Sequence, residues 1–383
     1  MPKRIAILTG GGHISSFHAG MLGVVKEAAK HNCEVIGFRD GYRGTVSDRW
    51  IPLSVEMLEA DRAGSLLGSS RERAEPHAVK EALARHSIDA LIVMGGNDHL
   101  GEAAKLAAQG LPVVGWPKTM DNDLSKTYFT LGYPTAAMRA AQMLREAHAD
   151  ALTSSRCHLV TIFGRDTDWV VAAAGVWGAA DVIVPAERAA GVTVTRYDVP
   201  FLLAKINAAM EANNQRFGRP FAVVVVAEGA DIDGLASHLN PEDFDKHGNV
   251  KIEPMKLAVT LKDALRDVSA KKLVIAIDCA SYVLRNGPPI DLDRRLAEKA
   301  GAASCKAALA GELGVSSVIR LGKRGWDVCV EPLAEVAPQR FMRPEHLFDY
   351  DRMEVLPAFA EFYTPVFGPP PKKEDVVYKA LVK

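Results

Sequence analysis

Short runs of apolar residues alternate along the chain with longer segments in which apolar positions recur at helical spacing. The apolar runs are continuous in Val, Ile and Leu, which is typical of parallel strands covered by helices on both faces. The expected strands are 4–9, 34–38, 89–93, 112–115, 158–163, 181–185, 221–227, 272–277 and 316–320. The expected helices are 18–31, 76–86, 101–109, 134–150, 167–178, 202–216, 253–268 and 292–313. This alternation predicts an α/β protein with mostly parallel sheets.

Composition narrows the class of protein. The 383 residues exceed what one ordinary hydrophobic core accommodates, and they suit two domains of moderate size. Hydrophobic residues make up 48% of the chain and charged residues 24%, with a formal net charge of −1, as in soluble globular proteins. Because so small a net charge creates no global field, we expect neither nucleic acid nor a membrane as a partner.

The cysteines and the N-terminal residues indicate a reducing compartment. The 5 cysteines are spread along the chain without CxxC spacing, which disfavours a disulfide framework or a zinc site. The apolar run before Gly10 is too short for a signal peptide, and no segment is long enough to span a bilayer. We therefore expect a cytoplasmic protein.

Two glycine-rich loops follow expected strands. Residues 9–13 read Thr-Gly-Gly-Gly-His, and residues 94–99 read Met-Gly-Gly-Asn-Asp-His. Glycines let backbone amides approach a ligand closely, and the N-terminus of a following helix favours an anion. Each loop is also compatible with a plain strand-to-helix turn. In the second loop, Asp98 would then be the N-cap of the following helix.

A third loop carries the most specific pattern of the chain. Residues 116–123 combine a cation, Lys118, and a hydroxyl, Thr119, with two carboxylates, Asp121 and Asp123. In an extended loop the two carboxylates face the same side, so that one could accept a proton while the other holds the loop or a metal. Structural loops rarely combine these groups so densely, and the pattern therefore favours catalysis.

Residues 117–123, Pro-Lys-Thr-Met-Asp-Asn-Asp, resemble the PxTIDND signature of the phosphofructokinase family, with Met in place of Ile. Further segments resemble, in the family's order, its first phosphate loop, its DGYxG segment, its phosphate-contacting turn, its MGR motif, its Glu-Gly pair and its SYxxR motif. These segments are 10–12, 40–44, 68–71, 163–165, 228–229 and 281–285. The resemblance covers about residues 4–330.

The resemblance implies two Rossmann-like α/β domains, with helices on both faces of mostly parallel sheets and the active site in the cleft between them. It implies a donor-binding domain of residues 1–132 and about 285–336, a sugar-phosphate-binding domain of residues 133–284, and a C-terminal extension of residues 337–383. It also implies a reversible, Mg²⁺-dependent phosphoryl transfer to the 1-hydroxyl of fructose 6-phosphate, in glycolysis or gluconeogenesis, by a homodimer or homotetramer.

Two positions resemble the pyrophosphate-dependent members of the family. Asp98 and Lys118 both stand where ATP-using members commonly have Gly. Asp98 places bulk and negative charge where the inner phosphate of a nucleotide would lie, whereas Lys118 offers a point charge to a short anion. We therefore expect pyrophosphate as the phosphoryl donor.

The resemblance also implies roles for the residues of the donor loops. Asp121 is expected to be the general base for the acceptor hydroxyl. Lys118, Arg71 and the Gly11 amide are expected to hold the donor phosphates and to stabilise the charge that spreads over the transferring group. Thr119 is expected to donate its hydroxyl to the same group.

Metal and acceptor residues follow from the same motifs. Mg²⁺ is expected at Asp98 and Asn97, where Asn97 replaces an Asp of the family and offers a weaker, neutral oxygen ligand. Tyr282 and Arg285 are expected to hold the distal phosphate of the acceptor, and Arg156 to reach the site of a neighbouring subunit. The full acceptor set is Thr119, Asp121, Asp123, Arg156, Phe163, Gly164, Arg165, Glu228, Tyr282 and Arg285.

Several alternatives stay open at this point. No basic residue stands about six positions before Tyr282, where the family usually has one, so another sugar phosphate such as sedoheptulose 7-phosphate is an alternative acceptor. ATP is the alternative donor. Asn97 suggests a weakly active regulatory paralogue. The strand–glycine–helix opening and Glu34 suggest an NAD-binding dehydrogenase, although Ser15 departs from the dinucleotide fingerprint.

Overall fold

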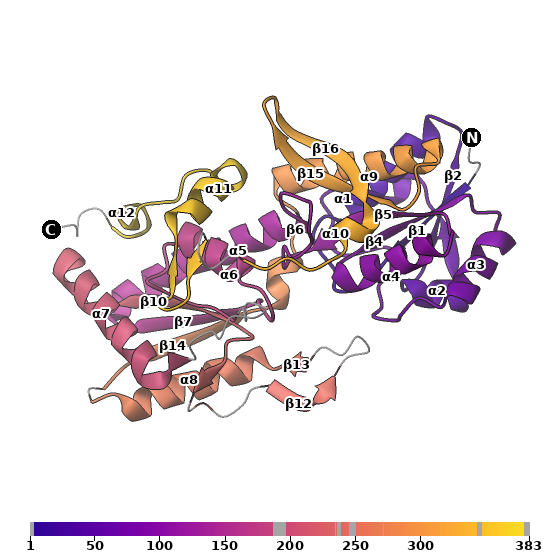
Figure 1. Ribbon diagram of the computed structural model, residues 1–383. Coiled ribbons are helices and arrows are strands. Elements are labelled where there is room, and N and C mark those ends of the chain that lie inside the picture. Colours follow the sequence, from indigo (N-terminus) through magenta and orange to yellow (C-terminus); the bar gives the residue numbers. More distant parts are fainter. Residues whose placement is uncertain are drawn as a thin grey trace. The chain divides into compact units, whose positions relative to one another are not determined.

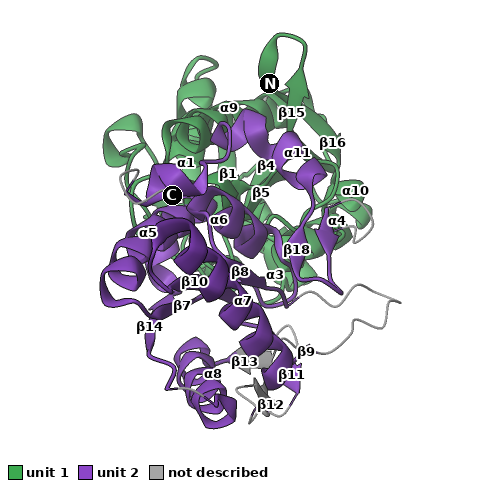
Figure 2. Cartoon of the chain, turned by 90° about the vertical axis from the view of Figure 1, so that its left-hand side faces the viewer, with its two compact units in different colours: residues 1–135, 245–249, 285–340 green, residues 136–244, 250–284, 341–383 purple. Residues whose placement is uncertain are grey.

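The computed structural model describes residues 4–186, 197–233, 235, 239–244, 250–270, 272–342 and 347–378. These residues form two compact units, each of which has its own sheet (Figures 1 and 2). The first unit contains residues up to 135 and residues 285–340, and the second contains the remaining described residues. The segment that the sequence sets apart as 337–383 is thus divided, because residues 337–340 belong to the first unit.

The first unit is built on one mixed sheet with the strand order β16-β15-β5-β4-β1-β2-β3. Its parallel strands are β1 (Arg4–Thr9), β2 (Glu34–Phe38), β4 (Ala90–Gly95), β5 (Val113–Thr119) and β15 (Val315–Gly322). Short β6 (Leu131–Gly132) pairs with the end of β5, and the antiparallel strands β3 (Trp50–Pro52) and β16 (Gly325–Pro332) form the two edges. The central strands β4 and β5 are buried throughout, as their apolar sequences predict.

Helices cover both faces of this sheet, as Figure 1 shows. They are α1 (Phe17–Ala29), α2 (Tyr42–Val46), α3 (Pro76–Arg85), α4 (Asn97–Ala108), α9 (Asp291–Ala310) and α10 (Leu333–Val336), with a 3₁₀ turn at Val55–Met57. Helices α1 and α9 approach so closely that a Cβ on Gly23 would lie 2.0 Å from the backbone oxygen of Glu298. The buried carboxylate of Asp293 accepts hydrogen bonds from the Gly132 amide at 3.0 Å and the Thr135 hydroxyl at 2.6 Å, and so joins α9 to β6.

The second unit has a fully parallel sheet with the order β14-β7-β10-β8. These strands are β7 (Cys157–Ile162), β8 (Val182–Val184), β10 (Ala222–Ala227) and β14 (Ile275–Ala280). The longer helices are α5 (Tyr133–Ser154), α6 (Trp169–Gly178), α7 (Val199–Phe217), α8 (Pro254–Val268) and α11 (Pro357–Phe367). Smaller elements are β9 (Tyr197–Asp198), β11 (Ile232–Asp233), β12 (Leu239–Phe244), β13 (Val250–Ile252), β17 (Phe348–Asp349), β18 (Glu354–Val355), α12 (Lys373–Val376) and a 3₁₀ turn at Tyr282–Arg285.

The aromatic C-terminal segment packs on the second unit. Trp169 of α6 stacks on Phe359 at 6.5 Å between ring centroids, and Trp177 lies 4.8 Å from Phe367. Farther along, the Lys373 ammonium pairs with Asp181 at 2.7 Å in a largely buried position. Residues 347–378 therefore complete the hydrophobic core around α6.

The structure confirms the predicted α/β class with mostly parallel sheets, and it corrects several element boundaries. The strand predicted to end at residue 115 continues as β5 to Thr119, because Lys118 and Thr119 pair with β6. The antiparallel edge strands β3 and β16 were not predicted, since their partly exposed residues lack a continuous apolar run. Within the described residues, no helix has the length and apolar character needed to cross a membrane.

Candidate active site

Three loops of the first unit meet at the carboxyl edge of its sheet, where ligands bind in open α/β sheets. They follow β1, β4 and β5, which are neighbours in the sheet. The Gly10 amide donates to the Met94 carbonyl at 3.0 Å, and the Gly11 amide donates to the Ser70 carbonyl at 3.0 Å. The glycine loop of residues 10–12 is thereby fixed against both the end of β4 and the turn at 68–71.

The glycine loop leaves room for cationic side chains. A Cβ on Gly11 would lie 2.9 Å from the Lys118 ammonium nitrogen, and one on Gly12 would lie 2.5 Å from Nη1 of Arg285. Gly11 also has a φ of +77°, a conformation that other residues rarely adopt. The φ of Gly11 thus favours glycine at that position, and the absence of side chains at both positions leaves open the space that the two cations occupy.

The Gly11 amide is not available for the contact expected of it. The Gly11 amide was predicted to bind the donor phosphates, but its hydrogen is already donated to the Ser70 carbonyl. The sequence pattern could not show this, because the partner lies on a turn 59 positions away in the chain.

Lys118 is the centre of the cationic cluster. Its side chain is buried within β5, and its ammonium donates to the Gly12 carbonyl at 2.8 Å. Burial, and after it the positive charge of Arg285, lower the pKa of this ammonium to about 7. The charge of Arg71, an exposed residue, acts in the same direction, while Asp121 and Asp123 oppose it. Such a cluster favours binding of an anion, which relieves the repulsion among the cations.

The carboxylates of the third loop differ in their surroundings. The Asp121 amide donates to the Thr119 hydroxyl oxygen at 3.0 Å, and that hydroxyl donates to the Asp121 carboxylate at 3.2 Å. Burial, and after it the negative charge of Asp121, raise the pKa of the Asp123 carboxyl to about 7. Burial and the neighbouring charge thereby favour the protonated form of Asp123.

The premise of an extended loop was wrong. The chain turns at Met120 and Asp121, and Asn122 between the two carboxylates has a φ of +54°, in the left-handed region. Asp121 and Asp123 therefore do not share a side through strand geometry. They are nevertheless close enough for one charge to raise the pKa of the other.

The candidate metal residues lie at the start of α4. Gly96 is the N-cap and Asn97 the first residue, so the alternative of Asp98 as a cap is wrong. The Asn97 side-chain oxygen accepts the Asp98 amide at 2.9 Å. Across the described residues, no group of three or more His, Cys, Asp or Glu side chains has the geometry of a metal site. One half-buried carboxylate nevertheless fits Mg²⁺, which usually takes one or two carboxylates together with substrate phosphates and water.

The candidate acceptor residues of the second unit gather at the carboxyl edge of its own sheet. Gly164 and Arg165 follow β7, Glu228 follows β10, and the Glu228 amide donates to the Ile162 carbonyl at 2.9 Å. Phe163 contacts the ring of Tyr282 edge to face, with 5.7 Å between centroids. Most of the predicted acceptor set in this unit is thus brought together.

Arg156 lies at the other end of β7, and Arg285 is the last residue of the 3₁₀ turn that begins at Tyr282. Arg156 precedes β7, at the opposite end of the strand from Gly164, and it pairs with Asp150. With a rise of about 3.3 Å per residue, the two ends of this strand are roughly 16 Å apart. Arg285 belongs to the first unit and approaches Gly12, whereas Tyr282, 62% exposed, belongs to the second.

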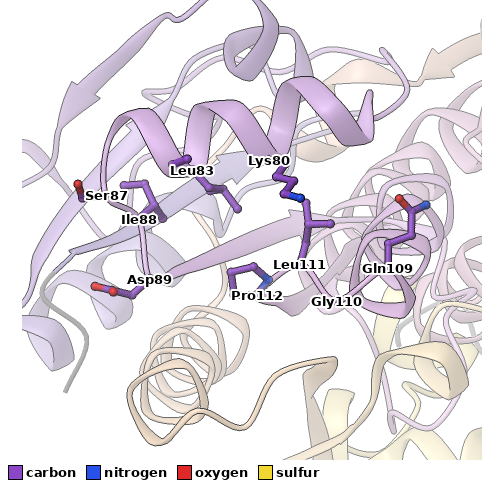
Figure 3. Close-up of a pocket in the computed structure, with 10 residues that line it drawn as sticks. Lys80, Leu83, Ser87, Ile88, Asp89, Gln109, Gly110, Leu111 and Pro112 are labelled. Atoms are coloured by element: carbon purple, nitrogen blue, oxygen red, sulfur yellow. The ribbon is translucent and has the colours of Figure 1, made fainter.

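Pockets lie at two places among the described residues of the first unit. One, of about 550 Å³, borders the residues that follow Gly41 and Arg71, and is lined by Tyr42, Arg43, Val46, Glu72, Arg73 and Glu75. The other, of about 400 Å³, lies at the amino ends of β4 and β5, away from the glycine loops (Figure 3). Only the first adjoins the candidate site.

Comparison with known proteins agrees with this arrangement. A family model described as "Phosphofructokinase" matches residues 4–308. The pyrophosphate–fructose 6-phosphate 1-phosphotransferase of Amycolatopsis methanolica is 32% identical over 361 residues, which cover 90% of this chain and 99% of that protein. ATP-dependent 6-phosphofructokinase 2 of Streptomyces coelicolor is 33% identical over 356 residues, which cover 90% and 98%. Relatives named for either donor are thus similarly close.

Solved structures show the same fold. The pyrophosphate-dependent phosphofructokinase from Marinobacter aquaeolei superposes with a TM-score of 0.79 at 23% identity, covering 96% of this chain and 92% of that chain. The one from Nitrosospira multiformis also gives 0.79, at 21% identity, covering 97% and 94%. At this identity the likeness establishes the architecture.

The lowered pKa of Lys118 generates a testable prediction. Binding of pyrophosphate favours the charged ammonium, so at pH 8 the protein should take up as much as about one proton per site, and the affinity should fall as pH rises above 7. Titration calorimetry in two buffers of different ionisation enthalpy measures the uptake. Because pyrophosphate itself titrates, Lys118→Met is the control, and equal uptake by the variant and the wild type would contradict the prediction.

Proposed function

Since this chain belongs to the phosphofructokinase family, we propose that it transfers a phosphoryl group from pyrophosphate to the 1-hydroxyl of fructose 6-phosphate. The observation that carries the proposal is the buried Lys118 ammonium, which lies against the glycine loop beside the carboxylates of the third loop. A buried point charge suits a short, highly charged anion. Relatives named as pyrophosphate–fructose 6-phosphate 1-phosphotransferases support the same donor and acceptor.

ATP is the second candidate donor. Relatives named as ATP-dependent phosphofructokinases are as similar as those named for pyrophosphate. The pocket of about 550 Å³ beyond Arg71 has room for a nucleoside. Asp98 counts against this donor, because its carboxylate at the start of α4 would repel the inner phosphates.

Phosphoryl transfer proceeds through a loose transition state, so positioning and charge stabilisation supply most of the catalysis. Asp121 accepts the proton of the acceptor hydroxyl, and the Thr119 hydroxyl that bonds it fixes the direction of its carboxylate. Lys118 and Arg285 neutralise charge on the transferred group and on the leaving phosphate. Arg71, at the exposed rim, adds a further positive charge.

Mg²⁺ fits the donor site as a substrate-borne ion. Asp98 would hold it, with the remaining ligands from donor phosphates and water, while the Asn97 oxygen is engaged by the Asp98 amide. The ion would shield phosphate charge and so complement the cations of the loop.

We assign the acceptor-binding residues from the positions of their side chains in the second unit. Glu228 accepts hydrogen bonds from sugar hydroxyls, and Arg165, Phe163 and Tyr282 form the rest of the acceptor surface of the second unit. Arg156 lies at the far end of β7 from that surface, so its contact with a sugar phosphate requires a second copy of the chain. The proposed acceptor contact of Arg156 thus goes together with a homodimer or a larger homo-oligomer.

A matrix of donors and acceptors tests the proposal. Pyrophosphate, ATP and ADP are assayed with Mg²⁺ against fructose 6-phosphate and sedoheptulose 7-phosphate, and we expect turnover with pyrophosphate and fructose 6-phosphate. Val46→Trp, which fills the pocket beside α2, should leave this turnover unchanged. Turnover with ATP alone, lost in Val46→Trp, would replace pyrophosphate by ATP as the donor. No turnover in any combination would reject the proposal.

Asp121→Asn should lower kcat by roughly 10²–10⁴, because the amide cannot accept the proton. The fold and the KM values should change little, since Asn can keep the hydrogen bond from Thr119. Steady-state kinetics and thermal unfolding of the variant and the wild type measure both. A turnover close to wild type would show that another group accepts the proton.

The variant Arg285→Ala distinguishes two possible roles of Arg285, binding of the acceptor phosphate and binding of the phosphoryl donor. The motif resemblance assigns Arg285 to the acceptor phosphate, but its position beside Gly12 and Lys118 favours the donor. We therefore expect the KM for pyrophosphate to rise at least about tenfold while the KM for the sugar phosphate changes less. The opposite pattern would return Arg285 to the acceptor.

A further inference from the structure

The loop that carries the carboxylates is held by a segment from the end of the first unit. Its backbone pairs with residues 336–340: the Arg340 amide donates to the Asp123 carbonyl at 2.7 Å, and the Ser125 amide lies 3.1 Å from the Val336 carbonyl. Leu124 and Gln339 form an isolated antiparallel bridge. The loop is therefore fixed from outside by the end of α10 and the segment that follows it.

The Arg340 guanidinium grips the same loop through several acceptors. Nε donates to the Asn122 carbonyl at 3.0 Å, and Nη1 donates to the Thr127 carbonyl at 2.6 Å. Nη2 donates to the Asn122 side-chain oxygen at 2.7 Å and to the Tyr128 carbonyl at 3.2 Å. The planar fork of one arginine thus joins the beginning and the middle of the loop.

Asn122 is the residue on which these contacts converge. It is fully buried, lies between the two carboxylates, and has the left-handed φ of +54°. Its side-chain oxygen accepts a second hydrogen bond, from the Thr130 amide at 3.0 Å, and the Thr130 hydroxyl donates to the Thr119 carbonyl at 2.6 Å. An unfavourable backbone conformation persists only where the surroundings determine it.

We propose that Arg340 is a positioning residue for phosphoryl transfer, which holds Asn122 in its left-handed conformation and so sets the direction of the Asp121 and Asp123 side chains. The inference rests on the proposed function, because it assigns a purpose to the geometry of that site. Arg340 itself acts through the loop backbone and not through the substrate. A misplacement of the base by about 1 Å can lower the rate by roughly 10²-fold.

Lys is a poor substitute for Arg at this position. The four hydrogen bonds radiate from one rigid plane to acceptors on three residues, which a single ammonium cannot reproduce. Gln339 supports the same loop more weakly, with its amide 3.3 Å from the Asp123 carboxylate. The geometry of the guanidinium, beyond its charge, is therefore what the loop requires.

The test compares Arg340→Ala, Arg340→Lys and the matched control Arg4→Ala. Arg4 also makes several hydrogen bonds, to Glu34 and to the His86 carbonyl, but lies at the other end of the strands. We expect kcat to fall about 10- to 100-fold in both Arg340 variants with KM values within about threefold, and Arg4→Ala to keep its kcat. Addition of millimolar guanidinium chloride should restore kcat to Arg340→Ala, whereas sodium chloride should not.

Hydrogen–deuterium exchange provides a readout that does not depend on activity. Peptides covering residues 119–132 should exchange faster in both Arg340 variants, and guanidinium should restore protection in Arg340→Ala. If the wild type shows no phosphoryl transfer but exchange in the loop still rises in the Arg340 variants, the proposed function fails. The role of Arg340 in holding the conformation of the loop then stands. Wild-type kcat in either folded Arg340 variant, unchanged exchange in this loop, or a loss that guanidinium does not repair would overturn the inference. Should Arg340→Ala not fold, Arg340→Lys decides by its kcat and its exchange.

Discussion

The Lys118 ammonium lies buried against a loop of glycines, and the carboxyl edge of the first sheet is arranged around it. A buried charge is costly unless it is paired, and the nearest partners of this one are a carbonyl oxygen, two cations and two carboxylates. The glycines are what allow the cations so close, and the pairing of β5 with β6 is what brings Lys118 there. The repulsion among the cations at this edge of the sheet favours binding of an anion there.

The sequence predicted the architecture well, because its strands are continuous apolar runs that only helix-covered parallel sheets accommodate. It also singled out Lys118, Thr119, Asp121 and Asp123, since a dense group of charged residues after a buried strand has few structural explanations. The same reasoning applies to the second unit. Gly164 and Glu228 come shortly after strands in the sequence, and the structure brings them to one edge of a sheet.

The remaining features depend on contacts between residues far apart in the chain. The left-handed conformation of Asn122 contradicts the extended loop that local spacing suggested, and Arg340, which holds it, lies 218 positions away. No local pattern marks such an arginine. The engagement of the Gly11 amide by Ser70 and the approach of Arg285 to Gly12 have the same origin. Contacts between distant residues decide which hydrogen-bond donors remain available to a ligand, whereas a sequence motif shows only that such donors are present.

The first unit is discontinuous in the chain, since residues 285–340 close it only after the four sheet strands of the second unit have been made. During synthesis the ribosome therefore releases the glycine loops and the carboxylates long before the strand, the helix and the arginine that hold them. A nascent chain that stops within the second unit has the chemical groups but not their arrangement. Translation order thus makes assembly of the reactive centre one of the last events in the maturation of the polypeptide.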